Sequence, residues 1–323
     1  MTTPRIDALQ YCQWSRAIFE QMREGGLDAV HATVLYHGGF HDCVRALADW
    51  NTLFDEHADL IRPVRTPDDL AAAQAEGRTA VLLGSQNPMP IQDDLGLVAV
   101  LRHLGLTVMQ LTYNQQSLLG TGCWEGTDGG LTAMGREVIA EMERVGMAID
   151  LSHANEATTL DAIGAASRPI AVTHANPAGW HATPRNVSDT VIDALAESGG
   201  MLGLSLYPHH LAGGSGCTLA AFCEMAARTA ERIGVERLGI GSDLCQGRPD
   251  AAVEWMRTGR WLRSRDEGAA FPAQPSWFES NRDWAGIASG LQEVGFDGSE
   301  VEAVMGGNWA RHLSGALACP NVP

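Results

Sequence analysis

The sequence is poor in positive charge and contains no cluster of it. Lys and Arg number 22 against 39 Asp and Glu, so the formal net charge at pH 7 is −17. Proteins that bind nucleic acid meet its phosphate backbone with grouped basic side chains. The sequence therefore predicts no nucleic-acid partner.

Long apolar runs and paired cysteines are also missing. No run approaches the roughly 20 apolar residues that cross a bilayer, and residues 1–7 lack the basic-then-apolar order of a signal peptide. The seven cysteines are an odd number without a CxxC pair, which is typical of reduced thiols. We therefore expect a cytoplasmic protein without a membrane partner.

No G-x-G-x-x-G follows the first apolar run, which argues against dinucleotide binding and a doubly wound open sheet, the alternative fold. Short apolar runs instead alternate with amphipathic segments over the 323 residues. The runs, read as strands, are Ile6–Tyr11, Ala29–Leu35, Ala80–Gly84, Val108–Tyr113, Ala148–His153, Ile170–His174, Met201–Leu206 and Leu238–Asp243. The pattern predicts an α/β fold, a (β/α)8 TIM-type barrel in one domain, 1–323, with a C-terminal extension.

Helices are predicted where apolar residues recur at helical spacing behind a good N-cap residue. These segments are 93–104, 132–145, 155–166, 188–198, 219–233 and 300–313. Residues 249–297, with four tryptophans, are predicted to be an irregular insertion after the eighth strand, covering the barrel mouth or a subunit partner. Residues 298–323 are predicted to be a closing helix and tail.

Three predicted strands end in ionisable residues, His153, His174 and Asp243. A single histidine is most often a buried polar residue, and an aspartate after Gly-Ser is most often a turn residue. Neighbouring barrel strands, however, bring their C-terminal ends together where active sites lie. The three residues predict a divalent-metal site, with Asp243 as a ligand or general base. Ser152, Thr173 and Asp150 are predicted to orient the rings.

Arg185 and Asn186 follow the His174 strand on a long loop. A loop arginine is as often merely solvated as it is functional. As a functional residue, Arg185 would hold a substrate carboxylate through two parallel hydrogen bonds.

Together the stretches 104–114, 130–135, 141–147, 150–153, 173–174, 185–186 and 304–308 resemble the membrane (renal) dipeptidase family, peptidase M19. The resemblance implies a (β/α)8 barrel with two zinc ions that activate a hydroxide to cleave a dipeptide. It implies that His153 and His174 bind the second zinc, that Asp243 transfers protons, and that Arg185 and Asn186 bind the substrate. It also favours a homodimer.

The sequence departs from this family at four positions. Leu9 and Tyr11 stand where the family's first-strand His-x-Asp binds the first zinc, and Gln86 replaces its bridging glutamate. Tyr113 replaces a histidine that steadies the oxyanion, a task that a phenol can also perform. The first metal site is thus predicted to be lost, with Gln86 at most a weak ligand. Whether other residues replace the ligands stays open, the choices being Cys123, Glu125, Cys245, His209 and His210.

Two functions follow. The first is a metal-dependent amidohydrolase that cleaves a small dipeptide or N-acyl amino acid with one Zn²⁺ per chain rather than two. In it Asp243 is the base, Tyr113 binds the oxyanion and Arg185 anchors the carboxylate. The second is a metal-poor barrel that binds a small carboxylate ligand or catalyses a reaction other than peptide cleavage.

Overall fold

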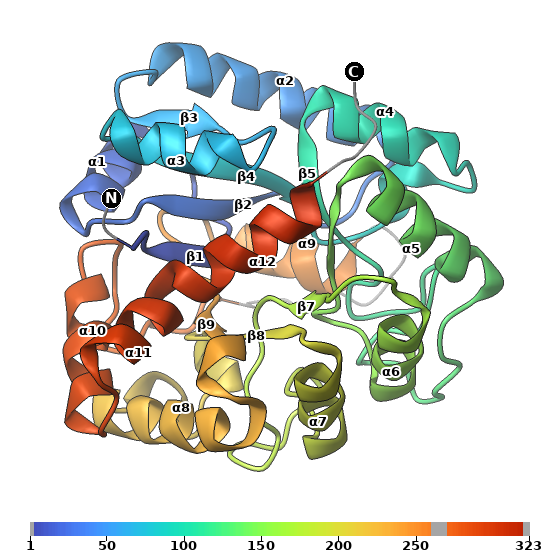
Figure 1. Cartoon of the computed structure of the whole chain (residues 1–323). Coiled ribbons are helices and arrows are strands. Elements are labelled where there is room, and N and C mark those ends of the chain that lie inside the picture. Colours follow the sequence, from blue (N-terminus) through green and yellow to red (C-terminus); the bar gives the residue numbers. More distant parts are fainter. Residues whose placement is uncertain (1–2, 260–269, 319–323) are drawn as a thin grey trace.

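Parallel strands form a nearly closed barrel in the computed structural model, which describes residues 3–259 and 270–318. Its path is β1 (Ile6–Gln10), β2 (Ala29–Leu35), β4 (Thr79–Ser85), β5 (Leu106–Gln110), β6 (Ala148–Asp150), β7 (Ala171–Val172), β8 (Met201–Leu204) and β9 (Leu238–Ile240). The ends of the path meet where the Tyr11 N–H donates to the Leu244 carbonyl at 3.1 Å. The predicted barrel is confirmed (Figure 1).

The strands differ from the prediction mainly at their carboxyl ends. Five of them stop two or three residues early, because the chain leaves the sheet before it reaches residues such as Tyr113, His153 and Asp243. One strand was not predicted: β3 (Ile61–Pro63) pairs with β4 outside the barrel path. Its three residues are too few to show a pattern, and Pro63 is typical of an edge.

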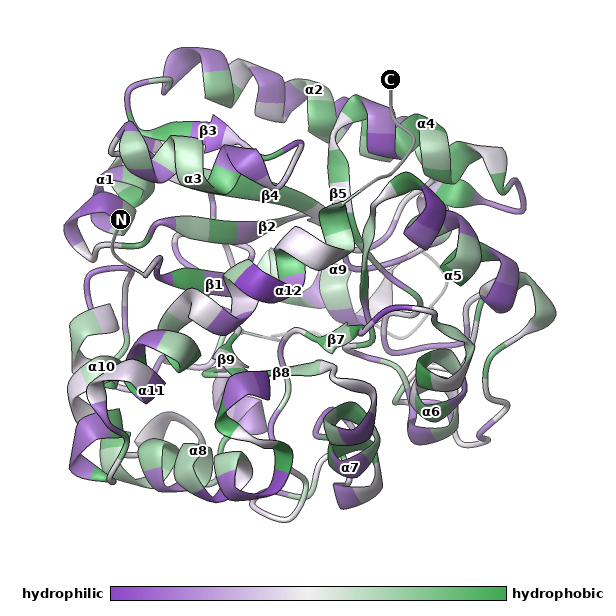
Figure 2. Cartoon of the chain, viewed as in Figure 1, coloured by the Kyte–Doolittle hydropathy of each residue, from purple (hydrophilic) through white to green (hydrophobic). Residues whose placement is uncertain are grey.

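Helices surround the barrel with their apolar sides inward, as the colours of Figure 2 show. Most of the predicted helices begin at a side-chain cap: Thr132, Asn155, Ser188 and Thr218 each accept a hydrogen bond from the N–H three residues on. The surrounding helices are α1 (Arg16–Glu24), α2 (Phe40–Glu56), α3 (Asp68–Ala75), α4 (Gly96–Leu104), α5 (Ala133–Val145), α6 (Glu156–Ala165), α7 (Asp189–Ser198) and α8 (Leu219–Ile233). Within the described residues, no helix has the length and apolar content needed to cross a membrane.

The amino end of the barrel is covered by α12 (Asn308–Leu317), which lies across the front in Figure 1. Trp309 is 1% exposed, packs on Ile6 and Ala29, and donates from Nε1 to the Ile240 carbonyl at 3.0 Å. The single helix predicted over 300–313 is instead α11 (Gly298–Glu302), a π-helical turn (Ala303–Gly307) and α12. At this break Gly306 has non-helical backbone angles (φ 165°, ψ −20°), and only glycine fits there, because a Cβ would lie 2.1 Å from the Pro4 carbonyl oxygen.

The predicted insertion is more regular than expected. It contains α9 (Ala251–Thr258) and α10 (Trp284–Glu293), while residues 260–269 of it lie outside the described residues. Val253 and Met256 of α9 pack on Leu9 and on three tyrosines at the carboxyl end of the barrel. Within the insertion, α9 therefore lies at the barrel mouth, whereas α10 packs beside α8.

Candidate active site

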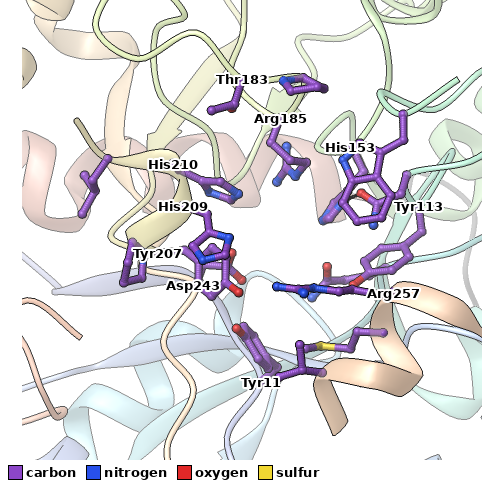
Figure 3. A pocket seen from close by; sticks show the side chains of 18 of the residues that line it. Tyr11, Tyr113, His153, Thr183, Arg185, Tyr207, His209, His210, Asp243 and Arg257 are labelled. Atoms are coloured by element: carbon purple, nitrogen blue, oxygen red, sulfur yellow. Dashed lines mark hydrogen bonds between the residues drawn. The ribbon is translucent and has the colours of Figure 1, made fainter. Parts of the chain in front are cut away.

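A cavity of about 1150 Å³ opens at the carboxyl end of the barrel, where barrel enzymes keep their active sites (Figure 3). Loops after different strands bring the predicted residues to it. Those that line it include Gln86, Tyr113, His153, Arg185, His209, His210 and Asp243. His174 lies behind this lining and is fully buried.

His153 and His174 point their Nε2 atoms at each other across 3.2 Å. The other ring nitrogen of His153, Nδ1, lies 2.6 Å from the Asn114 carbonyl oxygen Oδ1. Because a carbonyl oxygen only accepts, His153 donates from Nδ1 and keeps a lone pair on Nε2.

His174 is held in the same tautomer by a relay through Thr173. The Thr173 hydroxyl donates to Asp150 Oδ2 at 2.6 Å, so its oxygen accepts from His174 Nδ1 at 2.8 Å. Asp150 also accepts from the backbone N–H groups of Ser152 and Thr173 and from Gln110 Nε2. The predicted orienting role of Thr173 and Asp150 fits this geometry, and His174 keeps its Nε2 lone pair.

Two lone pairs that face each other repel, and a cation between them removes the repulsion. Burial, and after it the Arg185 guanidinium, lowers the pKa of His153 and of His174, so both rings are neutral at pH 7. A separation of 3.2 Å matches the roughly 3.3 Å between two nitrogen ligands of a tetrahedral zinc with Zn–N bonds of about 2.0 Å. The histidine pair therefore fits a metal ion.

The described residues do not complete the coordination by themselves. Within residues 3–259 and 270–318, no group of three or more His, Cys, Asp or Glu side chains could hold a metal ion. Glu125 accepts from the Gln116 N–H, and His210 Nδ1 is 2.8 Å from Ser205 Oγ. Cys123, Cys245 and His209 likewise join no such group, so the described residues offer no replacement ligand.

Backbone strain is concentrated around the cavity. Of the four described non-glycine residues with positive φ, Asn114 (61°), His153 (68°) and Asp243 (57°) belong to the site. Such angles cost free energy and persist where the surrounding structure enforces them, most often at functional sites. At His153 and Asp243 the left-handed turn redirects the chain directly after the strand, toward the cavity.

Asp243 lies 7% exposed on the cavity wall, with its backbone N–H bonded to the Leu9 carbonyl at 3.0 Å. Burial raises the pKa of its carboxyl to about 7, and Arg185 opposes the rise. A carboxyl group with that pKa can take up and release a proton near neutral pH.

Arg185 and Asn186 use their side chains differently. Arg185 donates from Nη2 to the His174 carbonyl at 2.8 Å, while its buried Nε has no partner among the described residues. The guanidinium thus keeps donors for a ligand in the cavity. Asn186 instead bonds the backbone of Asn176, His181 and His210 and holds the loop together, so its substrate contact stays a prediction.

Several lining residues were missed from the sequence. Asn114, Tyr36, Tyr207 and Arg257 line the cavity or orient His153, yet none of them ends a strand or matches a metal-binding spacing. One signal was available: the chain has only four tyrosines, and all four line this cavity.

Comparison with known proteins identifies the family of this chain. The family model described as membrane dipeptidase (peptidase family M19) matches residues 14–258. The chain belongs to this family. The match begins after Leu9 and Tyr11, the residues predicted to replace the first-metal ligands.

Other members and solved structures agree with the family assignment. The solved structure of an amidohydrolase from Pseudomonas aeruginosa is 34% identical to this chain in sequence and matches its fold with a TM-score of 0.94. The match covers 98% of this chain and 97% of the other. Dipeptidase verJ of Clonostachys rogersoniana is 29% identical to this chain over 60% of its residues. The matched part spans only 50% of that relative's length. A metallo peptidase from Rhodobacter sphaeroides, solved with a phosphinate mimic of the dipeptide L-Ala-D-Ala, shares the fold with a TM-score of 0.79 at 19% sequence identity. The match covers 97% of this chain and 99% of the other.

The residues predicted to replace the first-metal ligands lie in an apolar environment. Leu9 is fully buried and Tyr11 is 3% exposed, and both belong to one apolar cluster with Tyr36 and Tyr113. Gln86 Nε2 donates to the Thr33 hydroxyl at 2.8 Å. The histidine pair lies beside this apolar cluster, since the ring centroids of Tyr113 and His153 are 4.3 Å apart.

The relay behind His174 gives a first prediction. Thr173→Val removes the oxygen that accepts from His174 Nδ1, so we expect zinc affinity to fall about 10- to 100-fold. Competition with a chelating dye measures it. Thr173→Ser keeps the hydroxyl and should retain the affinity; equal losses in both variants would contradict the relay.

Proposed function

We propose that this family member is a metal-dependent amidohydrolase that cleaves the amide bond of a small dipeptide or N-acyl amino acid. One observation carries the proposal: two tautomer-fixed histidines direct Nε2 lone pairs at each other across 3.2 Å beside a substrate-sized cavity. The retained Arg185 at the same cavity supports a substrate with a carboxylate.

We propose one Zn²⁺ per chain, bound by His153 and His174. When bound, the ion would lower the pKa of a coordinated water to about 7 and polarise the amide carbonyl. Asp243 and Gln86 line the same cavity, and their roles as further ligands stay predictions.

The protein's own residues would carry the remaining steps. Asp243 would take the proton from the water whose oxygen attacks the carbonyl carbon, and return it to the nitrogen as the C–N bond breaks. Burial, then Asp243, raises the pKa of Tyr113, which keeps its hydroxyl protonated and able to donate to the oxyanion. Arg185 would hold the carboxylate of the substrate through its unused donors.

Metal content and hydrolysis test this function together. After dialysis, plasma mass spectrometry should find about one zinc per chain, and a chelator should abolish the cleavage of an alanyl dipeptide until zinc is returned. About two zinc ions per chain would show that the first site has other ligands. No zinc, and no cleavage with Zn²⁺, Mn²⁺ or Co²⁺, would favour the metal-poor, carboxylate-binding alternative.

We also propose a cytoplasmic homodimer. The six described cysteines are all free, as in a reducing compartment. Four apolar side chains in or before α4 are 37–44% exposed, and a second copy would cover them: Met89, Leu95, Val100 and Leu104. Light scattering tests the dimer, and a monomer at micromolar concentration would contradict it.

A further inference from the structure

A second arginine, Arg257, lines the cavity in addition to Arg185. It lies in the last turn of α9, directly after Met256, which packs among the tyrosines of the cavity. Arg185, in contrast, lies on the loop after β7. Figure 3 shows both arginine side chains directed into the cavity. The cavity therefore contains two guanidinium groups from distant segments, and the proposed function uses only one of them.

The charge of the cavity lining is opposite to that of the whole protein. The chain has a formal net charge of −17, yet Asp243 is the only acidic residue among the described ones that line the cavity. Two guanidinium groups outweigh this single carboxylate, and a zinc ion at the histidine pair would add further positive charge. A lining of this kind attracts anions, and it suits a ligand with more than one acidic group.

Tyr207, on the segment after β8, orients Arg257. Burial and then Asp243 raise the pKa of Tyr207 to about 12, while the charge of Arg257 and its hydrogen bond to the Tyr207 side chain oppose the rise. This contact joins α9 to the loop across the cavity. A guanidinium has five N–H donors in a planar fork, so Arg257 can hold a carboxylate while it stays bonded to Tyr207.

The hydroxyl of Tyr36 is an independent sign of a polar ligand. Tyr36 is 5% exposed, lines the cavity and packs with Val253 and Met256 of α9. Its Oη is buried without a hydrogen-bond partner among the described residues. A buried hydroxyl without a partner costs free energy, which a bound oxygen acceptor would recover. The guanidinium carbon of Arg248, 5.8 Å from the Tyr36 ring centre, adds positive charge on this side.

We propose that Arg257, with the hydroxyls of Tyr36 and Tyr207, forms a subsite for a second carboxylate, carried by the acyl half of the substrate. Arg185 holds the carboxylate of the amino acid half, so the substrate would extend between the two arginines with its amide bond at the histidine pair. The inference rests on the proposed function. It narrows that function to a preference for acyl groups that carry an acid, such as succinyl or aspartyl, over neutral ones such as alanyl.

Binding of a simple dicarboxylate to the zinc-loaded protein tests the subsite without any hydrolysis. Pimelate has as many chain atoms as N-succinylglycine and no amide bond. Isothermal calorimetry should show that pimelate binds about tenfold more tightly than its monoamide, which replaces one carboxylate by a neutral group of the same shape. Equal binding of the two compounds would overturn the proposal.

Three variants test which residues form the subsite. Arg257→Met keeps an unbranched side chain without its charge, so it should reduce the preference for pimelate to less than about twofold. Tyr36→Phe should weaken pimelate about threefold. The control is Arg228→Met, since Arg228 is an exposed residue of α8, paired with Glu224 and outside the cavity lining.

The control removes the same unit of charge as Arg257→Met, from the surface, and should leave both affinities unchanged. Equal losses in Arg228→Met and Arg257→Met would show an effect of net charge alone and refute the subsite. Unchanged affinities in both Arg257→Met and Tyr36→Phe would refute it as well.

Substrate selectivity distinguishes a failure of the subsite from a failure of the function. N-succinylglycine should have a kcat/KM at least about tenfold above that of N-succinamoylglycine, its neutral amide, and Arg257→Met should remove this difference without loss of zinc. A preference for β-alanylglycine, which places an ammonium group on the acyl half, would overturn the subsite and leave the function standing. Tight pimelate binding without cleavage of any of the three compounds would do the reverse.

Discussion

His153→Ala should lower kcat/KM for an alanyl dipeptide by about 10³-fold and release the bound zinc. The expected loss follows from several kcal/mol of carbonyl polarisation and water activation that depend on the ion. With His153 gone, only His174 offers a lone pair at this position, since no other described side chain completes a group of ligands. Kinetic assays combined with plasma mass spectrometry measure both effects.

The matched control is His103→Ala. His103 is an exposed residue in the last turn of α4, away from the cavity lining, and its loss should change neither zinc content nor rate. Full activity in His153→Ala would refute a metal role for the histidine pair. Equal losses in both variants would point to a general effect of removing an imidazole.

Gly241→Ala should destabilise the protein by about 3 kcal/mol or more and weaken zinc binding with it. Gly241 follows β9, and a Cβ there would lie 1.8 Å from the Thr173 carbonyl oxygen and 3.3 Å from the His174 Cβ. A backbone carbonyl cannot rotate away from the new methyl group as a flexible side chain could. The segment that carries Thr173 and His174 must therefore move. Urea unfolding and zinc titration measure the two effects.

Gly164→Ala provides the comparison within the same chain. Gly164 lies in α6, and a Cβ there meets nothing within 4 Å. Alanine should therefore stabilise the protein by about 0.5–1 kcal/mol, because glycine is the poorer helix former. A similar loss of stability at both positions would contradict the close backbone approach at Gly241.

The sequence identifies the barrel because its strands are buried on both faces. Continuous apolar runs such as Leu238–Ile240 mark these strands, and the histidines that follow two of them mark the site. The strand ends are less certain from sequence, since a buried apolar residue just beyond a strand looks like part of it. Leu151 and Leu206 are such residues, buried but outside β6 and β8.

Other features depend on contacts between distant segments. Nothing near Tyr36 in the sequence indicates that it meets Tyr113, and Asn114 orients a histidine 39 residues away. The need for glycine at position 306 comes from the backbone of Pro4, near the other end of the chain. Periodicity reports the local environment of a segment, so it cannot reveal such pairings.

Because Trp309 lies in the last described helix, the amino end of the barrel stays uncovered until late in synthesis. A nascent chain that has emerged as far as Ile240 already contains every described strand of the barrel. The apolar residues at the amino end of the barrel, Ile6 and Ala29 among them, are then still without the helix that covers them, α12. Exposed apolar surface on a ribosome-bound chain invites chaperones and aggregation. Release of the last described helix, Asn308–Leu317, is therefore the step that ends this vulnerable period.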